Sequence, residues 1–593
     1  MADQEIQPNV PVRELISKIW SLFDRKDHRR LIGILALMLI GTMMDVLGVG
    51  LIVPVIAILS NPDSLKEVPM VGAIHQMLGS PATHTFLLWS LGGLLTVFVI
   101  KNVFLYAVYQ IQNRFIYQKY AEIAGRLTSG YLLRPYTFHL QKNTAQLIRN
   151  ISSELPRLVS SVLVPGLLLV SESLVFLGLF MLAIFFNPVA TLIATAVLGT
   201  VLWLFYSFFR PSLAMWGRRV QEHSGGMIQQ LQQGLGGIKE VKLYGRESHV
   251  TKNFVRHADI YTRNACRHLT LNQSSRLMVE TLVIVVLLGT VMTLVISTSQ
   301  TSSILTTLAL YAAIAFRLMP SANRLLTAAT SIRFGTEALN VIHEDLKAIP
   351  VEQGDNKEKT KFLSFREAIE LRNVTYTYEG AHQPVMEGVN LRLEHGIMAG
   401  FHGESGAGKT TLVDLILGLI EPDEGKIFVD GQPIGSNLNG WQRQIGYVPQ
   451  SIFLTDDTLR RNVAFGLEDK HIDDSRVWES IRLAQLDEFV KGKPDGLDTI
   501  VGERGIRLSG GQRQRIGIAR ALYHDPAVLV LDEATAALDS ETEDGFIEVI
   551  RSLKDGKTIL IISHRLSTLR HCHEQFQMDN GQITPVMAEA IES

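Results

Sequence analysis

Six apolar stretches in the first 330 residues constrain this chain more than any other feature. A bilayer core about 30 Å thick is spanned by about 20 mostly apolar residues in helical form, and each stretch is long enough. The pattern therefore predicts a polytopic α-helical membrane domain rather than the buried helices of a soluble protein. The stretches are Leu31–Leu59, Thr85–Tyr109, Val162–Phe186, Val189–Phe209, Leu277–Ile296 and Ile304–Ala328.

The distribution of basic residues predicts the topology. Residues 1–30 hold six Lys and Arg, residues 112–161 hold seven and residues 210–276 hold eleven, whereas residues 61–84 contain only Lys66. By the positive-inside rule, both termini are cytoplasmic. The polar segment 1–30 has no short apolar core with a cleavage site, so we expect no removable signal peptide. The two cysteines, Cys266 and Cys572, are expected to be reduced.

The remaining chain has the composition of a soluble domain. We predict a cytoplasmic N-terminal segment (1–30), a transmembrane domain (31–346), a linker (347–366) without apolar periodicity, and a second domain (367–593). Alternation in Ile369–Tyr378 predicts its first strand. The long basic segments between apolar stretches favour helices that continue beyond the bilayer. With 56 basic and 58 acidic residues, net charge gives no support for a nucleic-acid partner.

A glycine-rich segment in the second domain fits the phosphate-binding loop pattern. It comprises Gly403, Glu404, Ser405, Gly406, Ala407, Gly408, Lys409 and Thr410, and the apolar segment from Thr411 predicts the following helix. Glycines allow backbone N–H groups to converge on phosphate oxygens at a helix N-terminus. Lys409 is expected at the β- and γ-phosphates of ATP, and the Thr410 hydroxyl at Mg²⁺. The alternative is a glycine-rich turn without a ligand.

A second motif supports nucleotide hydrolysis. The apolar run Val528–Leu531 ends in Asp532 and Glu533, as expected for a buried strand that presents acids at its carboxyl end. Asp532 suits Mg²⁺ coordination, and Glu533 suits a base that polarises the attacking water.

A third motif narrows the class. Leu508–Arg515, with Ser509, Gly510, Gly511 and Gln512, resembles the signature sequence of ATP-binding cassette proteins. Six apolar segments followed by one cassette resemble a half-transporter of the type IV exporter class, which implies an α/β P-loop nucleotide-binding domain with a helical subdomain.

The resemblance also implies roles for individual residues. Tyr378 would stack on adenine, Gln450 would serve in the Q-loop as a metal and catalytic residue, Asp539 would lie in the D-loop, and His564 would be the switch histidine. The signature residues would face the nucleotide of a second copy, so one cassette per chain implies a homodimer. Two positions depart from the usual pattern, Ala536 and Arg461, and the latter leaves the coupling contact open.

Two arginines are candidates for cargo binding. Arg317 and Arg324 lie seven residues apart, hence on nearly one helical face, about 20 and 30 Å from the outer end of the last apolar stretch. Guanidinium groups there suit a pyrophosphate. Alternatively, the arginines pair with Glu280 or Glu172, or extend towards lipid head groups. Asp45 and Lys101 are interpreted as helix-interface or snorkelling residues.

The segment Ala312–Thr327 is similar to the corresponding helix in the family of bacterial lipid-linked oligosaccharide flippases that serve protein N-glycosylation. The resemblance implies ATP-driven flipping of a polyprenyl-diphosphate glycan across a bacterial inner membrane. It also implies an external amphipathic helix containing Met70, Val71, Ile74, Met77 and Leu78, for which packing against membrane helices is the alternative. Export of another lipid, a drug or a peptide, and a non-transporting ATPase that gates a partner, remain alternative functions.

Overall fold

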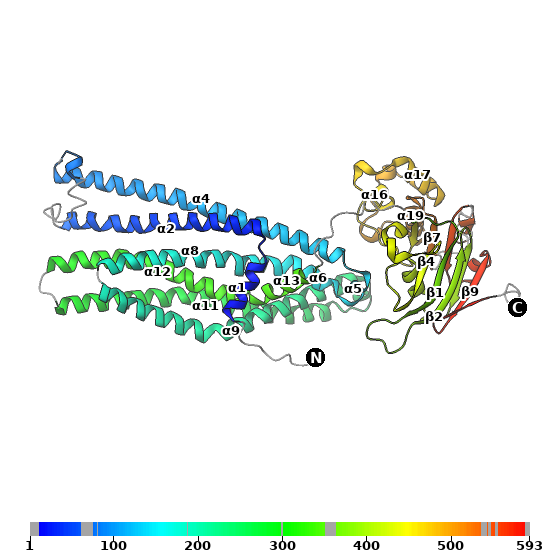
Figure 1. Cartoon of the computed structure of the whole chain (residues 1–593), viewed down its shortest axis with the longest axis horizontal. Helices are drawn as coiled ribbons and strands as arrows, with labels where there is room; N and C mark the ends of the chain where they lie inside the picture. The colour runs from blue at the N-terminus through cyan, green and yellow to red at the C-terminus, as the bar shows by residue number, and fades with distance from the viewer. Residues whose placement is uncertain are drawn as a thin grey trace. The chain divides into compact units, whose positions relative to one another are not determined.

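The computed structural model describes residues 11–60, 75–79, 81–186, 188–297, 301–349, 363–534 and 556–586, together with a few positions between 543 and 551 (Figure 1). Met70, Val71, Ile74, Ala536, Asp539 and most of the predicted linker lie outside these residues. The chain forms two compact units, residues 1–134 with 139–351, and residues 135–138 with 352–593.

Each of the six predicted apolar stretches coincides with a long helix of the first unit. These helices are α2 (Arg25–Ser60), α4 (Thr83–Leu132), α8 (Val164–Phe186), α9 (Pro188–Gly236), α11 (Glu247–Ser297) and α12 (Thr301–Phe334). Among the described residues, five helical ranges, including α2, α4, α9 and α11, are long and apolar enough to cross a membrane. The 50 residues of α4 extend about 75 Å, far beyond a 30 Å bilayer core, as the sequence predicted.

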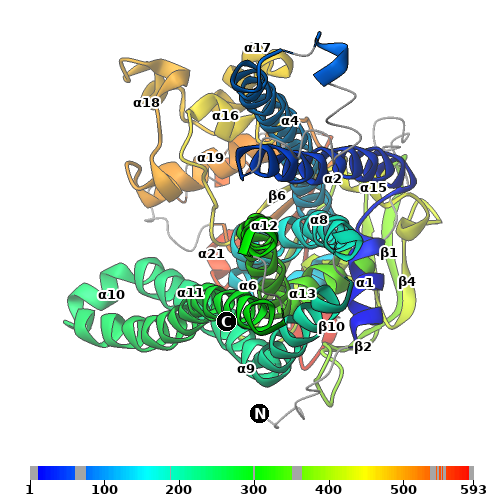
Figure 2. The ribbon, with the colours of Figure 1, turned by 90° about the vertical axis from the view of Figure 1, so that its left-hand side faces the viewer.

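Shorter helices complete this unit. They are α1 (Val12–Ser21), α6 (Thr144–Arg149), α7 (Leu155–Leu158), α10 (Ile238–Leu243) and α13 (Thr336–Ala348), with π-helical turns η2 (Asn150–Glu154) and η3 (Val159–Leu163) on either side of α7. Helix α5 (Tyr136–Gln141) contains residues of both units. Figure 2 shows α9 and α11 running side by side towards α10. Small residues allow close helix packing: a Cβ on Gly178 of α8 would lie 2.7 Å from Val46 Cγ2 of α2.

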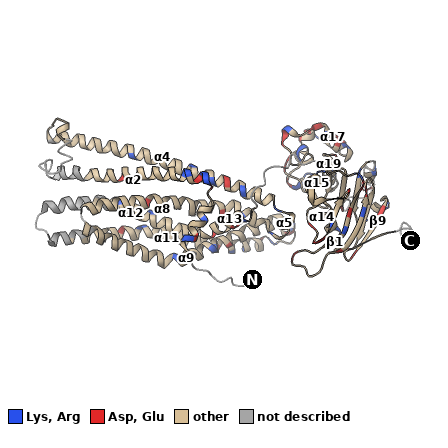
Figure 3. Ribbon diagram, viewed as in Figure 1, with Lys and Arg blue, Asp and Glu red and all other residues tan. Residues whose placement is uncertain are grey.

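Charged side chains are unevenly distributed over the helical bundle. Figure 3 shows them concentrated in one half of its length and sparse along the other, in agreement with the apolar stretches. Between α2 and α4, residues 75–77 form a helical turn, and Met77 and Leu78 are both exposed. Among the described residues of this unit, these two side chains are therefore not buried against neighbouring helices, which was the alternative drawn from the sequence.

The second unit contains two sheets. The antiparallel sheet has the order β2-β1-β4-β5, and the other has the order β10-β9-β3-β8-β7-β6, in which β9, β3, β8, β7 and β6 are parallel. Strand β1 agrees closely with the predicted first strand. The strands are β1 (Ala368–Tyr376), β2 (Met386–Glu394), β3 (Met398–Gly403), β4 (Glu424–Val429), β5 (Gln432–Pro433), β6 (Ile445–Val448), β7 (Val528–Asp532), β8 (Thr558–Ile562), β9 (Glu574–Asp579) and β10 (Gln582–Pro585).

Helices cover the parallel sheet and form a subdomain. They are α14 (Lys409–Ile416), α15 (Leu438–Gln442), α16 (Leu459–Val463), α17 (Asp474–Leu483), α18 (Asp487–Lys491), α19 (Gly510–Leu522) and α21 (Leu566–Leu569), with short 3-10 helices at Ile434–Asn437, Asp469–His471, Gly496–Asp498 and Glu503–Gly505. Strands β7 and β8 are buried along their whole length, which explains their uninterrupted apolar sequences. Two apolar cores result, one between the sheets and one beneath α16, α17 and α19.

Candidate functional site

The carboxyl ends of four adjacent parallel strands bring the predicted nucleotide residues together. In the order β3-β8-β7-β6, the glycine-rich loop follows β3, His564 follows β8, Asp532 and Glu533 end β7, and Gln450 follows β6. In open α/β sheets, ligands bind outside this edge. Residues as far apart in sequence as Gly403 and His564, 161 positions, therefore meet because parallel pairing aligns the strand ends.

The loop between β3 and α14 has the backbone conformation of a phosphate cradle. Gly406 and Gly408 have φ angles of 89° and 99°, which side chains with a Cβ rarely adopt, and Gly408 caps the N-terminus of α14. Gly403 is required for a different reason, since a Cβ there would lie 2.2 Å from the carbonyl oxygen of Met578. Backbone N–H groups and the positive end of the α14 dipole favour an anion here.

Lys409 and its neighbours complete the loop. Lys409 is only 6% exposed, and its Nζ donates to the carbonyl oxygens of Gly403 (2.8 Å) and Glu404 (2.7 Å). Burial lowers the pKa of Lys409, although the carboxylates of Glu533 and Asp532 act in the opposite direction. Thr410 is exposed, as an ion-binding hydroxyl must be.

Thr411 and Tyr378 form a second contact at the same helix. Thr411 is buried, and its hydroxyl lies 3.1 Å from the hydroxyl of Tyr378. This bond holds Tyr378, the residue expected to stack on adenine, beside the first turn of α14.

Glu533 is the centre of a three-residue cluster. Gln450 Nε2 donates to Glu533 Oε2 at 2.6 Å, and His564 Nε2 lies 3.0 Å from Glu533 Oε1. A carboxylate oxygen can only accept, so Nε2 carries the proton. Glu533 has a φ of 46°, an uncommon conformation for a residue with a side chain. The structure thus brings together all three residues predicted to be catalytic.

Burial and mutual repulsion disfavour the charged forms of the acidic residues near the glycine-rich loop. Burial raises the pKa of Asp532, helped by the charge of Glu533, while hydrogen bonding from Tyr447 and the charge of Lys409 oppose the shift. Burial also raises the pKa of Asp414, on α14, to about 6, with a contribution from Asp532. A divalent cation at Asp532 would offset this repulsion, so the donor set fits Mg²⁺. Asp414 and Tyr447 were missed from the sequence, although Asp414, an acid within the apolar run Leu412–Ile416 of α14, was a visible signal.

The signature residues form the N-terminus of α19. Ser509 caps this helix in a capping box with Gln512, and Gly510 and Gly511 are its first residues. Ser509 Oγ accepts from the backbone N–H of Gln512, and Gln512 Oε1 accepts from the backbone N–H of Ser509, so both side chains are engaged within α19. Arg461, a departure from the usual pattern, pairs with Asp457 and Asp469.

The structure gives both arginines of α12 a carboxylate partner. Arg324 Nη1 lies 3.1 Å from Oε1 of the buried Glu172, one of the two predicted partners, and Ser321 also donates to Glu172. Arg317 pairs with Asp45 instead of Glu280, a contact that the sequence did not predict because α2 and α12 are far apart in the chain.

Asp45 has a second cationic partner. Lys101 Nζ lies 3.1 Å from Asp45 Oδ1. Asp45 and Lys101 therefore lie at a helix interface, which was one of their two predicted placements, and they belong to an ion network with Arg317. The arginine side chains keep 22% (Arg317) and 34% (Arg324) of their surface exposed, so the carboxylates orient both guanidinium groups without enclosing them.

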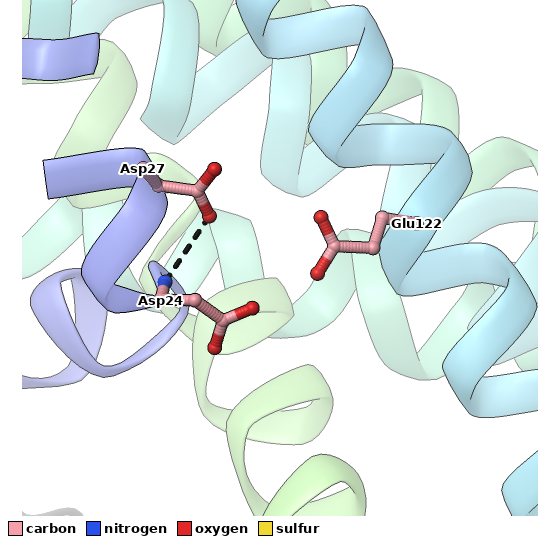
Figure 4. Close-up of side chains that lie close together, drawn as sticks. All are labelled: Asp24, Asp27 and Glu122. Atoms are coloured by element: carbon pink, nitrogen blue, oxygen red, sulfur yellow. Dashed lines mark hydrogen bonds between the residues drawn. The ribbon is translucent and has the colours of Figure 1, made fainter. Parts of the chain in front are cut away.

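A separate carboxylate group lies at the start of α2. Figure 4 shows Glu122 of α4 close to Asp27, in the first turn of α2, and to Asp24, just before that helix. The buried Lys119 Nζ lies 2.7 Å from Asp27, 2.7 Å from Glu122 and 3.5 Å from Asp24. Because the lysine ammonium occupies the position that a metal ion would need, this group acts as an ion pair between α2 and α4.

Comparisons with known proteins identify the class. The family model for the ABC transporter transmembrane region matches residues 31–319, and the ABC transporter model matches residues 386–536. The ATP-dependent lipid A-core flippase of Saccharophagus degradans is 31% identical over 464 residues, 77% of each chain. The flippase of the same name from Cupriavidus pinatubonensis is 31% identical over 511 residues, 84% of each chain.

A solved structure has the same fold. A bacterial Atm1-family ABC exporter with ATP bound aligns with a TM-score of 0.76 at 22% identity, over 94% of each chain. The chain belongs to the ATP-binding cassette transporter family. It is a multi-pass membrane protein with the predicted type IV exporter fold, and its second unit is an ATPase coupled to transport.

Proposed function

We propose that the chain is an ATP-driven homodimeric flippase that moves a polyprenyl-diphosphate-linked oligosaccharide from the cytoplasmic to the outer leaflet of a bacterial inner membrane. The observation that carries the choice of cargo is the oriented, partly exposed pair Arg317 and Arg324 on one face of α12. Guanidinium groups bind phosphate oxygens through two parallel hydrogen bonds, and such binding is strongest where water is scarce.

The charge balance around this pair supports an anionic cargo group. Arg317, Arg324 and Lys101 contribute three positive charges, and Asp45 and Glu172 contribute two negative charges. The network keeps one excess positive charge within a membrane-embedded bundle, where uncompensated charge is costly. A pyrophosphate would compensate it, and transient binding of that kind is what a translocated substrate requires.

The relatives support a lipid as cargo. Two similar proteins are named ATP-dependent lipid A-core flippases, and they match this chain through both its membrane region and its cassette. The resemblance of Ala312–Thr327 to lipid-linked oligosaccharide flippases narrows the proposal from lipids in general to a polyprenyl-diphosphate glycan.

The geometry of the cassette supports specific roles for its residues. The loop Gly403–Thr410 would hold the phosphates of ATP, and Lys409 would leave its loop carbonyls to neutralise their charge. When bound through Thr410, Gln450 and Asp532, Mg²⁺ would supply charge neutralisation at the β- and γ-phosphates. Glu533 would accept a proton from the attacking water, while Gln450 and His564 hold its carboxylate in place.

Dimerisation would complete each site. Ser509, Gly510, Gly511 and Gln512 lie at a helix N-terminus, which attracts anions, and we propose that they face the nucleotide held by the second copy. Asp539 would lie at the same junction. In this arrangement both termini are cytoplasmic, the membrane domain comprises residues 31–346, and the cassette comprises residues 367–593.

One observation favours a second candidate cargo. An apolar cavity between α8, α9, α11 and α12 has a volume of about 80 Å³ and is lined by Phe176, Phe180, Leu198 and Val286, among others. A lipid chain, or an apolar drug or peptide side chain, would fit these walls. Export of such a molecule is the alternative to glycan-lipid flipping.

Flipping in proteoliposomes tests the proposal. A short-chain polyprenyl-diphosphate oligosaccharide is incorporated, and its movement to the opposite leaflet is followed for the wild type and for the double variant Arg317→Ala with Arg324→Ala. We expect the double variant to hydrolyse ATP but to lose flipping. Lysine at both positions keeps the positive charges but lacks the two parallel N–H donors of a guanidinium group, so this variant should retain partial flipping activity. Wild-type flipping by the alanine variant, with hydrolysis intact, contradicts a pyrophosphate site.

A further inference from the structure

A second cavity of the first unit, lined by both apolar and polar side chains, does not include Arg317 or Arg324. It has a volume of about 710 Å³ and lies between α4, the segment η2–α7–η3, α9, α11 and the end of α12. This volume is within the range of about 300 to 1,000 Å³ typical of ligand pockets. The cavity lies in the part of the bundle that the basic residues assign to the cytoplasmic side.

The walls of the cavity carry hydroxyl groups and aromatic rings. Ser153 and Ser160 come from the π-helical segment, Ser224 from α9, and Tyr120 and Tyr261 from α4 and α11. Serine and tyrosine hydroxyls both donate and accept hydrogen bonds, and aromatic faces pack against C–H groups. This composition suits a neutral molecule with many hydroxyl groups.

Glu154 lines the cavity and has an unused acceptor. Its side chain is 1% exposed, and Oε2 has no hydrogen-bond partner. Arg157 Nη1 lies 3.9 Å from Oε2, and Arg149 Nε lies 4.0 Å from Oε1, so both pairs are beyond hydrogen-bond distance. A buried acceptor without a donor costs about 1–3 kcal/mol, more when it is charged, so a ligand hydroxyl that reached Glu154 Oε2 would remove this cost.

Arg157, by contrast, is already engaged. Its Nη2 donates to the carbonyl oxygen of Gly217 at 3.1 Å, and its guanidinium lies 4.7 Å from the centroid of the Phe334 ring. Because one carboxylate and one guanidinium line the cavity, their charges balance. The site therefore does not select an anion, which distinguishes it from the cluster around Arg317 and Arg324.

The backbone at Glu154 is irregular in a way often found at functional sites. The π-helical turns η2 and η3 flank α7, and each ends within two residues of a proline, Pro156 or Pro165. Proline has no N–H to donate to the carbonyl oxygen four residues earlier, so the series of helical backbone hydrogen bonds is interrupted there. The π turns shift the helical register, which sets the face on which Ser153, Glu154 and Ser160 lie.

We propose that this cavity binds the glycan part of the cargo. This inference rests on the proposed flipping of a glycan lipid, and it adds a glycan site that is separate from the pyrophosphate site at Arg317 and Arg324. Phe334 lies ten residues after Arg324 on α12, about 15 Å further along the helix. A lipid whose pyrophosphate lies at Arg324 would project its first sugars into this region, where Glu154 accepts from their hydroxyls and Tyr120 and Tyr261 pack against their rings.

The test combines binding and transport by the full-length protein in lipid nanodiscs and vesicles. Ser153→Phe fills the cavity, and Ser152→Phe places the same side chain on the adjacent exposed residue outside it. Glu154→Gln keeps the shape of the side chain but weakens its acceptor. The ligands are a polyprenyl diphosphate carrying a neutral disaccharide, the same lipid without sugars, and soluble neutral di- and trisaccharides built from glucose, galactose and their N-acetylated amines.

We expect Ser153→Phe and Glu154→Gln to raise the half-saturating concentration of the glycan lipid at least tenfold in stimulated ATP hydrolysis. Binding of the sugar-free lipid should stay unchanged, and Ser152→Phe should behave as the wild type. Equal losses for the lipids with and without sugar, or equal losses in Ser152→Phe and Ser153→Phe, overturn the inference.

Soluble glycans separate this inference from the proposed function. If the wild type flips no glycan lipid, the proposed function fails, but saturation-transfer NMR with the soluble saccharides still tests the cavity. Binding that Ser153→Phe removes supports the glycan site by itself, whereas binding of none of the saccharides to the wild type refutes it.

Discussion

The ion pair between Arg324 and Glu172 allows a structural role to be separated from a role in cargo binding. Arg324→Ala would leave the carboxylate of Glu172 buried, with Ser321 as its remaining hydrogen-bond donor. Removing one partner of a buried pair costs about 3–5 kcal/mol, and we expect the lower end because the Arg324 side chain is one-third exposed. At about 2 °C per kcal/mol, the unfolding midpoint should fall by roughly 6 °C.

The paired variant Arg324→Ala with Glu172→Gln removes both charges. It should recover most of the lost stability, because no uncompensated charge remains and the amide still accepts from Ser321. We expect it not to recover flipping of a polyprenyl-diphosphate glycan, because the guanidinium that would bind the phosphate is still missing. Thermal unfolding in nanodiscs and flipping in proteoliposomes measure the two properties separately. Recovery of both stability and flipping would refute the cargo role of Arg324 and leave it a purely structural residue.

Three further predictions concern the cassette. Glu533→Gln should lower ATP turnover by about 10²–10⁴-fold while ATP still binds, measured by phosphate release and nucleotide binding; undiminished turnover would exclude Glu533 as the base. Gly408→Ala should weaken ATP binding, because the φ angle of 99° at this position is unfavourable for a residue with a Cβ. Gly435→Ala, at a position with open space and an ordinary φ, should leave ATP binding unchanged. Equal affinities of the two variants for ATP would contradict a phosphate-binding role of the glycine-rich loop. Asp414 has a pKa of about 6 in place of 3.8, so the native state holds its proton more tightly than the unfolded chain, and stability falls as pH rises from about 4 to 6. Asp414→Asn should remove this loss, stabilising the nucleotide-free protein above pH 6 by up to about 3 kcal/mol, and an unchanged pH profile of thermal unfolding would refute that assignment.

The sequence predicted those parts of the fold that depend on local patterns. Apolar length identified the helices, and the motifs around Lys409 and Glu533 identified the nucleotide site, because phosphate binding needs particular residues at fixed spacing. Parallel pairing of β3, β8, β7 and β6 then explains why the predicted residues meet at one edge.

Contacts between distant segments could not be predicted in the same way. The partner of Arg317 is 272 positions away, and only the packing of α2 against α12 brings Asp45 to it. The π-helical turns before α8 were missed: the sequence predicted that helices continue beyond the apolar stretches, but not that the helix between Thr144 and Val164 contains two π-helical turns. Pro156 and Pro165 were a signal of irregularity, but not of the register that results.

The most direct test of the central claim is the movement of a polyprenyl-diphosphate oligosaccharide between leaflets in vesicles that contain only this protein. Movement should require ATP in the wild type and should be lost in Glu533→Gln, although ATP binds to both proteins. ATP hydrolysis by the wild type without movement of the glycan lipid, or equal movement in Glu533→Gln, would contradict ATP-driven flipping.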